Sequence, residues 1–255
     1  KDGRAIVFHG LNRGRAATCA LAAGHLRVLL AGMIAWAKQR YVHGKLLAET
    51  ELIQSRCAQV AALIAGCDAL AKWCGSLLDA GYRGEIECII AKVFASEAVK
   101  HAAFDLALPT HGGRFFLQGH PAGDLAYDYL APCIYEGEND LLRLAVFHSL
   151  AKTVSANTTR PAAESGNLMS DPIWPTDLPQ SQMIEYSKQF VERVTVKFVL
   201  KSAVASQASQ DRAAIELLLR QLSGDRSRSA MLAEVELGQQ LFEEELFALA
   251  DALPF

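Results

Sequence analysis

The sequence predicts an all-α protein: an up-and-down four-helix bundle followed by a smaller helical C-terminal extension. Three observations support this fold class. Apolar residues recur at helical spacing through most of the 255-residue chain, and 51% of all residues are hydrophobic, which is enough for a large core. The predicted helices are also long and joined by short turns, as in antiparallel bundles.

The first half of the chain is predicted to form three long helices. The short apolar run at residues 5–8 is the expected end of a strand. Helices are predicted over residues 13–40, 46–80 (ended by Gly81) and 84–108 (ended by Pro109). In the second helix the apolar positions alternate steps of four and three residues, which is typical of a helix packed lengthwise against others. This seam consists of Ile53, Cys57, Val60, Ile64, Cys67, Ala71, Cys74 and Leu78.

The second half is more divided. Residues 109–132 are rich in glycine, proline and aromatic residues and are predicted to form a functional loop with a short helix at 122–130. A helix is predicted over 138–152, so the bundle domain covers residues 1–152. Four prolines mark a linker at 153–182. The extension, 183–255, has predicted helices at 183–207, 211–222 and 226–253. The acidic face of its last helix argues against anionic lipid, so packing on the bundle or a second subunit is expected.

Composition excludes several partners. The chain has 25 basic and 28 acidic side chains, a net charge of −3, and therefore no extended basic surface for nucleic acid. The apolar run at residues 16–37 could span a bilayer by length, but an arginine at its middle, Arg27, would cost about 2.5–3.5 kcal/mol there, so a buried helix is predicted. The six cysteines read as reduced core residues of an intracellular protein, and no histidine spacing indicates a metal site.

Glu136 is the leading candidate for chemistry. It lies in the stretch I-Y-E-G-E-N-D-L-L, residues 134–142, between apolar residues and a glycine just before a predicted helix. Desolvation in such a loop disfavours a charged carboxylate and suits it to act as a general base. Glu138 and Asp140 have a simpler explanation, as first-turn acids that complement the helix dipole.

This stretch resembles the Y-E-G-T-N-E-I-L motif of the acyl-CoA dehydrogenase family, whose glutamate is the catalytic base. Three further segments match in the same order. Residues 10–15, G-L-N-R-G-R, resemble the family's G-L-N-G-G-R; residues 40–45, R-Y-V-H-G-K, resemble R-x-Q-F-G-K; and Gly112–Gly113 match the glycines of Q-x-x-G-G. The resemblance covers residues 2–151 and is nearest to the very-long-chain branch. It implies that the family's N-terminal and β-domains are missing from this chain.

The resemblance implies FAD-dependent α,β-dehydrogenation of an acyl-CoA or acyl-carrier thioester, with Glu136 as α-proton base and hydride transfer to the flavin. It also implies a homodimer or dimer of dimers, an electron-transfer flavoprotein as acceptor, and a place in the bacterial cytoplasm or the mitochondrial matrix. The implied cofactor contacts are Arg40, Gly112, Gly113, Gly137 and Glu138, and the implied substrate contacts are Arg15 and Tyr135.

Departures from the family pattern keep two alternatives open. Pro109 replaces a glutamine that contacts FAD, and Tyr127 and Leu130 replace arginines of an R-D-x-R segment. Glu138 replaces a threonine, and acyl-CoA oxidases have an acidic residue at that point. The alternatives are therefore an oxidase and a non-catalytic dimerisation or docking module with a decayed FAD site. The chain by itself is expected to be inactive, because the flavin pocket would come from the missing domains.

Overall fold

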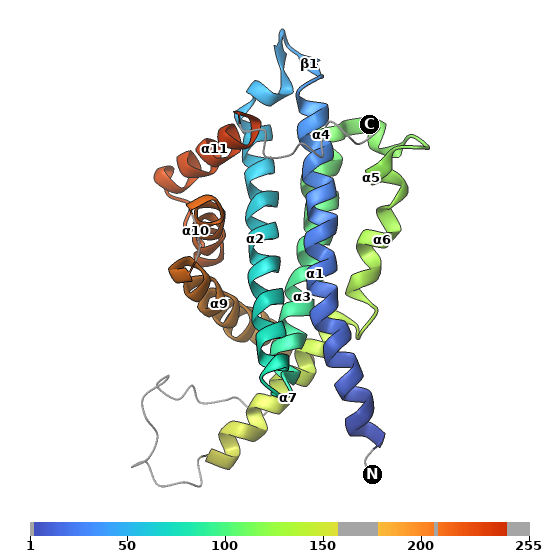
Figure 1. Ribbon diagram of the computed structural model, residues 1–255, viewed down its shortest axis with the longest axis vertical. Coiled ribbons are helices and arrows are strands. Elements are labelled where there is room, and N and C mark those ends of the chain that lie inside the picture. The colour runs from blue at the N-terminus through green and yellow to red at the C-terminus, as the bar shows by residue number, and fades with distance from the viewer. Residues whose placement is uncertain (1–2, 158–177, 207–208, 244–255) are drawn as a thin grey trace.

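The computed structural model describes residues 3–157, 178–206 and 209–243. These residues are helical apart from connecting turns and one hairpin whose strands are two residues long (Figure 1), so the predicted all-α class is confirmed. Three long helices lie side by side and alternate in direction: α1 (Gly3–Ala37), α2 (Glu51–Asp79) and α3 (Glu85–His101). The predicted seam of α2 faces this core, since its members are buried except for the half-buried Ala71 and Leu78.

The helical pattern begins earlier than the sequence indicated. Helix α1 starts at Gly3, so the strand expected over residues 5–8 and the helix start at residue 13 are both wrong. In the structure Ile6 and Val7 are exposed on the first turns of α1. A strand needs a neighbouring strand to pair its backbone groups, and among the described residues none is available there; helix formation satisfies those groups locally.

A β-hairpin that the sequence analysis did not predict joins α1 to α2. Strands β1 (Tyr41–Val42) and β2 (Lys45–Leu46) pair antiparallel, and the 3-10 turn η1 (Leu47–Glu49) leads into α2. The two turn residues, His43 and Gly44, have φ values of +51° and +82°. Two consecutive positive φ values suit the right-handed twist of a tight hairpin. Helix α1 consequently ends at Ala37, before Arg40.

The prediction that Pro109 ends the third helix at residue 108 is wrong. Helix α3 continues through a π-helical segment, η2 (Ala102–Ala107), into α4 (Leu108–His111). Pro109 occupies the first turn of α4, where a missing N–H costs least. The chain then descends beside α1 and α3 in short pieces (Figure 1): η3 (Gly112–Phe116), α5 (Pro121–Asp124), α6 (Ala126–Leu130) and η4 (Ala131–Cys133). The helix predicted at 122–130 is thus two helices, α5 and α6.

Helix α7 (Asn139–Asn157) follows at the lower end of the bundle in Figure 1 and packs on α3. It takes up the first residues of the predicted linker, and 158–177 lie outside the described residues. The extension begins with α8 (Gln180–Tyr186), which runs through a π-helical segment, η5 (Ser187–Glu192), into α9 (Arg193–Ser206). Helices α10 (Ser209–Ser223) and α11 (Arg228–Glu243) follow, and the rest of the helix predicted over 226–253 lies outside the described residues.

The extension packs along α2, which confirms the expectation that it docks on the bundle (Figure 1). Gly238 of α11 lies so close to the backbone of Gln54 that a Cβ atom would collide with it. Glu234, from the acidic face of α11, accepts hydrogen bonds from Ser55 and from Gln59 Nε2, the latter at 2.8 Å. Part of that acidic face therefore serves the docking of α11 on α2.

Helix α1, over Ile6–Ala37, and helix α2 are long and apolar enough to cross a membrane by length and composition alone. More than half of the most apolar window of each, 61% and 56%, is buried inside the protein. Both helices supply the centre of the core, so packing within the bundle accounts for their apolar character.

Candidate active site

The loop between η4 and α7 holds Glu136 in an unusual backbone conformation. Glu136 has a φ of +58° and Gly137 a φ of +111°. A non-glycine residue in the left-handed region costs about 1–3 kcal/mol and persists only where the surroundings hold it. Glycine is required at position 137 for two reasons: its φ is positive, and a Cβ atom there would lie 2.8 Å from Leu142. Such strain concentrates at functional sites, which makes this loop the first place to look for chemistry.

The side chain of Glu136 lies against Gly14 of α1. A Cβ atom at Gly14 would be 2.6 Å from Oε1 of Glu136 and 2.9 Å from its Oε2, so only glycine leaves room for the carboxylate. The Oε2 atom is buried and has no hydrogen-bond partner. A carboxylate oxygen that is shielded from water and not engaged by a donor is free to accept a proton from a bound molecule.

Substituting Gly14 by alanine tests this packing. We expect the new methyl group to displace the carboxylate, and misplacement of a reacting group by about 1 Å can cost about 10²-fold in rate. Helix α1 itself should tolerate alanine, which has a higher helix propensity than glycine. The measurements are the rate of the dehydrogenation that the sequence resemblance implies and the thermal unfolding of the protein. Gly24→Ala is the matched control, because a Cβ atom at Gly24 meets nothing within 4 Å; equal rates in both variants would contradict the prediction.

Arg15 supports the Glu136 loop from α1. Its guanidinium is buried and donates from Nε to the carbonyl oxygen of Glu136, at 3.1 Å, and from Nη1 to Asn12 Oδ1, at 3.2 Å. Asn12 in turn donates to the carbonyl oxygen of Arg83, at 3.0 Å. Burial lowers the pKa of Arg15, which arginine tolerates without losing its charge. The structure shows support of the loop; the predicted contact of Arg15 with substrate stays a prediction.

Lys92 of α3 holds the next carbonyl group of the same loop. Its side chain is fully buried, and Nζ donates to the carbonyl oxygen of Gly137, at 2.6 Å, and to Asn139 Oδ1, at 2.8 Å. Burial lowers the pKa of Lys92 to about 8. The sequence analysis did not identify this residue. The available signal was a single lysine within the apolar stretch I-I-A-K-V-F, residues 89–94 of a predicted core helix.

A chain of buried polar contacts leads from this loop to the extension. Asn139 Nδ2 donates to Glu97 Oε1, at 2.9 Å, and Glu97 lies 3.8 Å from Nη1 of Arg143. Arg143, itself buried, donates from Nε to Glu192 Oε1 of η5, at 2.6 Å. The carbonyl oxygen of Arg143 also accepts a hydrogen bond from Ser187, at 2.9 Å. The extension is thereby attached to the bundle beside the candidate site.

Glu138 and Tyr135 flank the loop. The carboxylate of Glu138 accepts the backbone N–H of Leu141, at 2.9 Å, and so caps the N-terminus of α7, where a negative charge is favourable. This hydrogen bond directs one carboxylate oxygen of Glu138, a predicted cofactor contact, toward the N-terminus of α7. Tyr135 is 39% exposed, and burial, followed by the charge of Glu136, raises the pKa of its hydroxyl. The predicted cofactor and substrate roles of Glu138, Gly137 and Tyr135 stay predictions.

The other predicted cofactor residues gather around Trp36 near the opposite end of α1. The guanidinium of Arg114 lies 4.1 Å from the centroid of the Trp36 ring, and that of Arg40 lies 6.0 Å from it. Arg114 follows Gly112 and Gly113 directly. Gly112 has a φ of +65°, and a Cβ atom at either glycine would meet open space. The structure thus places Arg114, which the sequence analysis missed, next to the two exposed glycines and, with Arg40, over the ring of Trp36.

The two groups of predicted site residues are far apart within one chain. Gly14, beneath Glu136, and Trp36, between the arginines, are 22 residues apart on α1. A helix rises 1.5 Å per residue, so about 33 Å separates them along the axis. Figure 1 shows this separation as the distance from the lower part of α1 to the hairpin. One chain therefore does not bring Arg40, Gly112 and Gly113 to Glu136.

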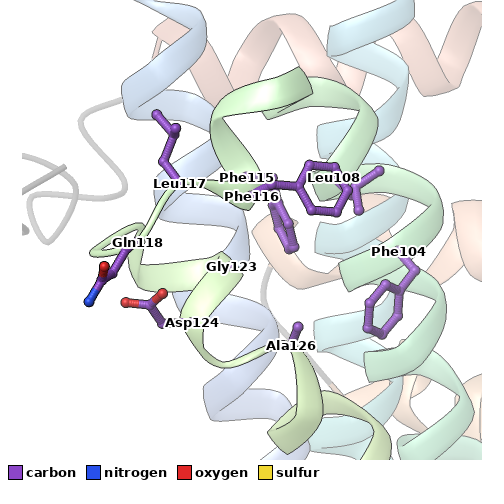
Figure 2. A pocket seen from close by; sticks show the side chains of 9 residues that line it. All are labelled: Phe104, Leu108, Phe115, Phe116, Leu117, Gln118, Gly123, Asp124 and Ala126. Atoms are coloured by element: carbon purple, nitrogen blue, oxygen red, sulfur yellow. The ribbon is translucent and has the colours of Figure 1, made fainter.

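A surface pocket of about 370 Å³ lies beside η2, η3 and α5. Its lining is mostly apolar, with Phe104, Leu108 and Phe115 facing the hollow in Figure 2. Asp124 at its edge already accepts the backbone N–H of Gly119, at 2.9 Å. No predicted site residue lines this pocket, so it belongs to neither group.

Two buried histidines pack against each other in the turn next to this pocket. The rings of His111 and His120 are 4.7 Å apart, and His120 Nδ1 accepts the backbone N–H of Gly123, at 3.1 Å. Burial, together with His120 and Arg114, lowers the pKa of His111 to about 3, which keeps it neutral. Within residues 3–157, 178–206 and 209–243 no group of three or more metal-ligating side chains is found.

The sequence profile described as "Acyl-CoA dehydrogenase, C-terminal domain" matches residues 1–151. An acyl-CoA dehydrogenase of Bacillus subtilis (strain 168) is 32% identical over 145 residues, which make up 57% of this chain and 38% of that protein. The very long-chain specific acyl-CoA dehydrogenase of Mus musculus is 31% identical over 146 residues, 57% of this chain and 22% of that protein. The chain spans less than half the length of these relatives.

Solved structures share the fold over nearly the whole chain, including the extension. An acyl-CoA dehydrogenase from Bacillus anthracis complexed with FAD matches 96% of this chain and 58% of its own, with a TM-score of 0.74 and 15% identity. Arabidopsis thaliana acyl-CoA oxidase 1 matches 98% and 50%, with a TM-score of 0.68 and 15% identity. Taken with the match over residues 1–151, these findings show that the chain belongs to the acyl-CoA dehydrogenase family and contains its C-terminal helical domain.

Proposed function

We propose that this chain is the C-terminal part of an FAD-dependent enzyme that removes hydrogen from the α and β carbons of an acyl-CoA or acyl-carrier thioester. The observation that carries the proposal is the position of Glu136. Its carboxylate lies on Gly14 with one oxygen buried and without a partner. Its loop is held in a strained conformation by Arg15 and Lys92.

In the proposed reaction Glu136 takes the α-proton of the thioester. Rigid placement matters, because a base positioned in advance spends no energy on reorientation as the proton moves. FAD, when bound, supplies the acceptor for the β-hydride. Gly14 leaves room for the carboxylate, and the buried cations beneath the loop keep its backbone from shifting while charge moves above it.

The residues around Trp36 fit the phosphates of such a cofactor. Arg40 and Arg114 are cations beside an open glycine turn, and guanidinium groups bind phosphate by paired hydrogen bonds. These residues lie about 33 Å along α1 from the Glu136 group. The proposal therefore includes a homodimer, or a dimer of dimers, in which Arg40, Gly112 and Gly113 of one copy serve the FAD that faces Glu136 of another.

Two alternatives have specific observations behind them. Glu138 provides the acidic residue that oxidases of this superfamily carry after Y-E-G, which favours oxygen over an electron-transfer flavoprotein as acceptor. Pro109, Tyr127 and Leu130 depart from the family's cofactor motifs, which favours a non-catalytic dimerisation module. The Glu136 loop argues against the non-catalytic module. Its strained backbone, held by two buried cations, is typical of a catalytic or ligand-binding site and is not needed for docking.

The visible absorption spectrum of the purified protein that contains this chain, followed by anaerobic addition of an acyl-CoA, tests the proposal. A flavin spectrum that bleaches on addition supports dehydrogenation. Oxygen uptake during aerobic turnover would then identify the oxidase. A protein that stays colourless when FAD is added would overturn the proposal in favour of the non-catalytic module.

A further inference from the structure

Lys92, like Arg15, is a buried cation of the described residues that forms no ion pair with a carboxylate, and it is the more deeply buried of the two. It is fully buried, and the ion pairs of the described residues do not include it. A buried ammonium group without a counter-ion is costly, and its presence calls for a compensating function. Its protons are directed at neutral acceptors, the carbonyl oxygen of Gly137 and the amide oxygen of Asn139.

The acceptor of the shorter bond belongs to the strained loop. Glu136 and Gly137 both have positive φ values, and the carbonyl groups of these two consecutive residues bind two buried cations, Arg15 from α1 and Lys92 from α3. Arg15 thereby holds the peptide unit that follows Glu136, and Lys92 holds the next unit along the chain. The backbone on the C-terminal side of the Glu136 Cα is thus fixed, and with it the direction in which the side chain of Glu136 leaves the backbone.

Neighbouring side chains keep Lys92 in place. Ser96, one turn further along α3, hydrogen-bonds Asn139, and Asn139 accepts the second bond from Lys92, so the ammonium group has one fixed position. The titratable groups facing it are Arg15 of α1, Glu97 of α3, Cys133 of η4 and Glu138 of the loop. The two carboxylates favour the ammonium form, and Arg15 and burial oppose it; burial raises the pKa of the Cys133 thiol, which keeps it neutral.

We propose that Lys92 is a positioning residue, which holds Glu136 in the geometry for proton removal by binding the carbonyl group of Gly137. The inference rests on the proposed function, since positioning matters only if Glu136 is the base. It predicts that loss of the charged donor lowers kcat, because Glu136 is then misplaced, and leaves KM unchanged, because Lys92 is buried beneath the loop.

The test compares Lys92→Met with Lys72→Met, which removes an exposed lysine of α2, in the FAD-loaded protein. We expect Lys92→Met to lower kcat by about 10²-fold, with KM and FAD content unchanged, and Lys72→Met to have no effect. Lys92→Gln, which keeps an N–H donor without the charge, should recover part of the rate. A kcat equal to that of the wild type in Lys92→Met would overturn the proposal.

The pH profile separates positioning from stability. Because burial lowers the pKa of Lys92 to about 8, kcat of the wild type should fall as pH rises through 8, and this fall should be absent in Lys92→Met. Between pH 8 and the ordinary value of 10.5, the unfolded chain holds a proton that the folded chain has released. The contribution of Lys92 to stability therefore rises with pH over this window. The titration of Lys92 thus makes the folded protein more stable above pH 8, so unfolding linked to this titration does not account for a fall in kcat there.

Hydrogen exchange of peptides covering residues 134–142 provides a readout that needs no activity. We expect faster exchange there in Lys92→Met and unchanged exchange in the remaining helices. If the wild type shows no flavin reduction by acyl-CoA, the proposed function fails, and the exchange result still decides whether Lys92 holds the loop. If the wild type is active but the variant keeps its rate and its exchange pattern, the positioning role alone fails.

Discussion

Replacing Glu136 by glutamine is expected to lower the rate of α,β-dehydrogenation by about 10²–10⁴-fold, the usual contribution of a positioned general base. Glutamine has nearly the same shape, so it fits the space over Gly14, but its amide cannot accept the α-proton. FAD content should not change, because the arginines that fit the cofactor phosphates, Arg40 and Arg114, lie near the other end of α1. The measurement is single-turnover flavin reduction by an acyl-CoA without air.

Glu236→Gln is the matched control, since it makes the same chemical change on an exposed glutamate of α11. Helix α11 packs on α2 and α10, and Glu236 has no proposed role in the site. A rate near that of the wild type is expected for this variant. Glu136 would lose its assignment as the base if Glu136→Gln kept the wild-type rate, or if both variants lost activity equally.

The second large effect is expected at the contact between α7 and the extension. Arg143→Met should lower the free energy of unfolding by about 3–5 kcal/mol, because it leaves Glu192 buried without its cation. The two side chains are only 6% and 15% exposed, and their closest atoms are 2.6 Å apart. Burial already raises the pKa of Glu192, and Arg143 opposes this rise. Without Arg143, the buried site should favour the protonated carboxyl group of Glu192 over its anion. The loss of unfolding free energy should therefore be smaller at acid pH.

Urea unfolding of the variant protein measures this loss. The exposed pair Arg212–Glu216, 2.9 Å apart in α10, provides the control, and Arg212→Met should change stability by about 0–1 kcal/mol. Adding Glu192→Gln to Arg143→Met should restore part of the stability, because the double variant buries no unpaired charge. Equal losses for Arg143→Met and Arg212→Met would show that the buried pair does not hold the extension.

The fold class and the candidate base could be predicted from the sequence because both depend on local patterns. Helical periodicity reports which face of a segment is apolar, and the seam of α2 from Ile53 to Leu78 indeed faces the core. Segment boundaries were less predictable. The strand expected at residues 5–8 is helical, and Pro109 lies inside a continuing helix, because backbone pairing and a π-helical segment depend on neighbours that periodicity does not report.

The sequence by itself determined an all-α chain of the acyl-CoA dehydrogenase family and the position of Glu136 within it. Only the tertiary structure decided what holds that glutamate: Gly14 beneath its carboxylate and Lys92 beneath its loop. It also decided that Arg40 lies far from Glu136 within one chain. The physical reason is that these relations join residues tens of positions apart, and helix packing, rather than any local pattern of residues, sets the distances between them.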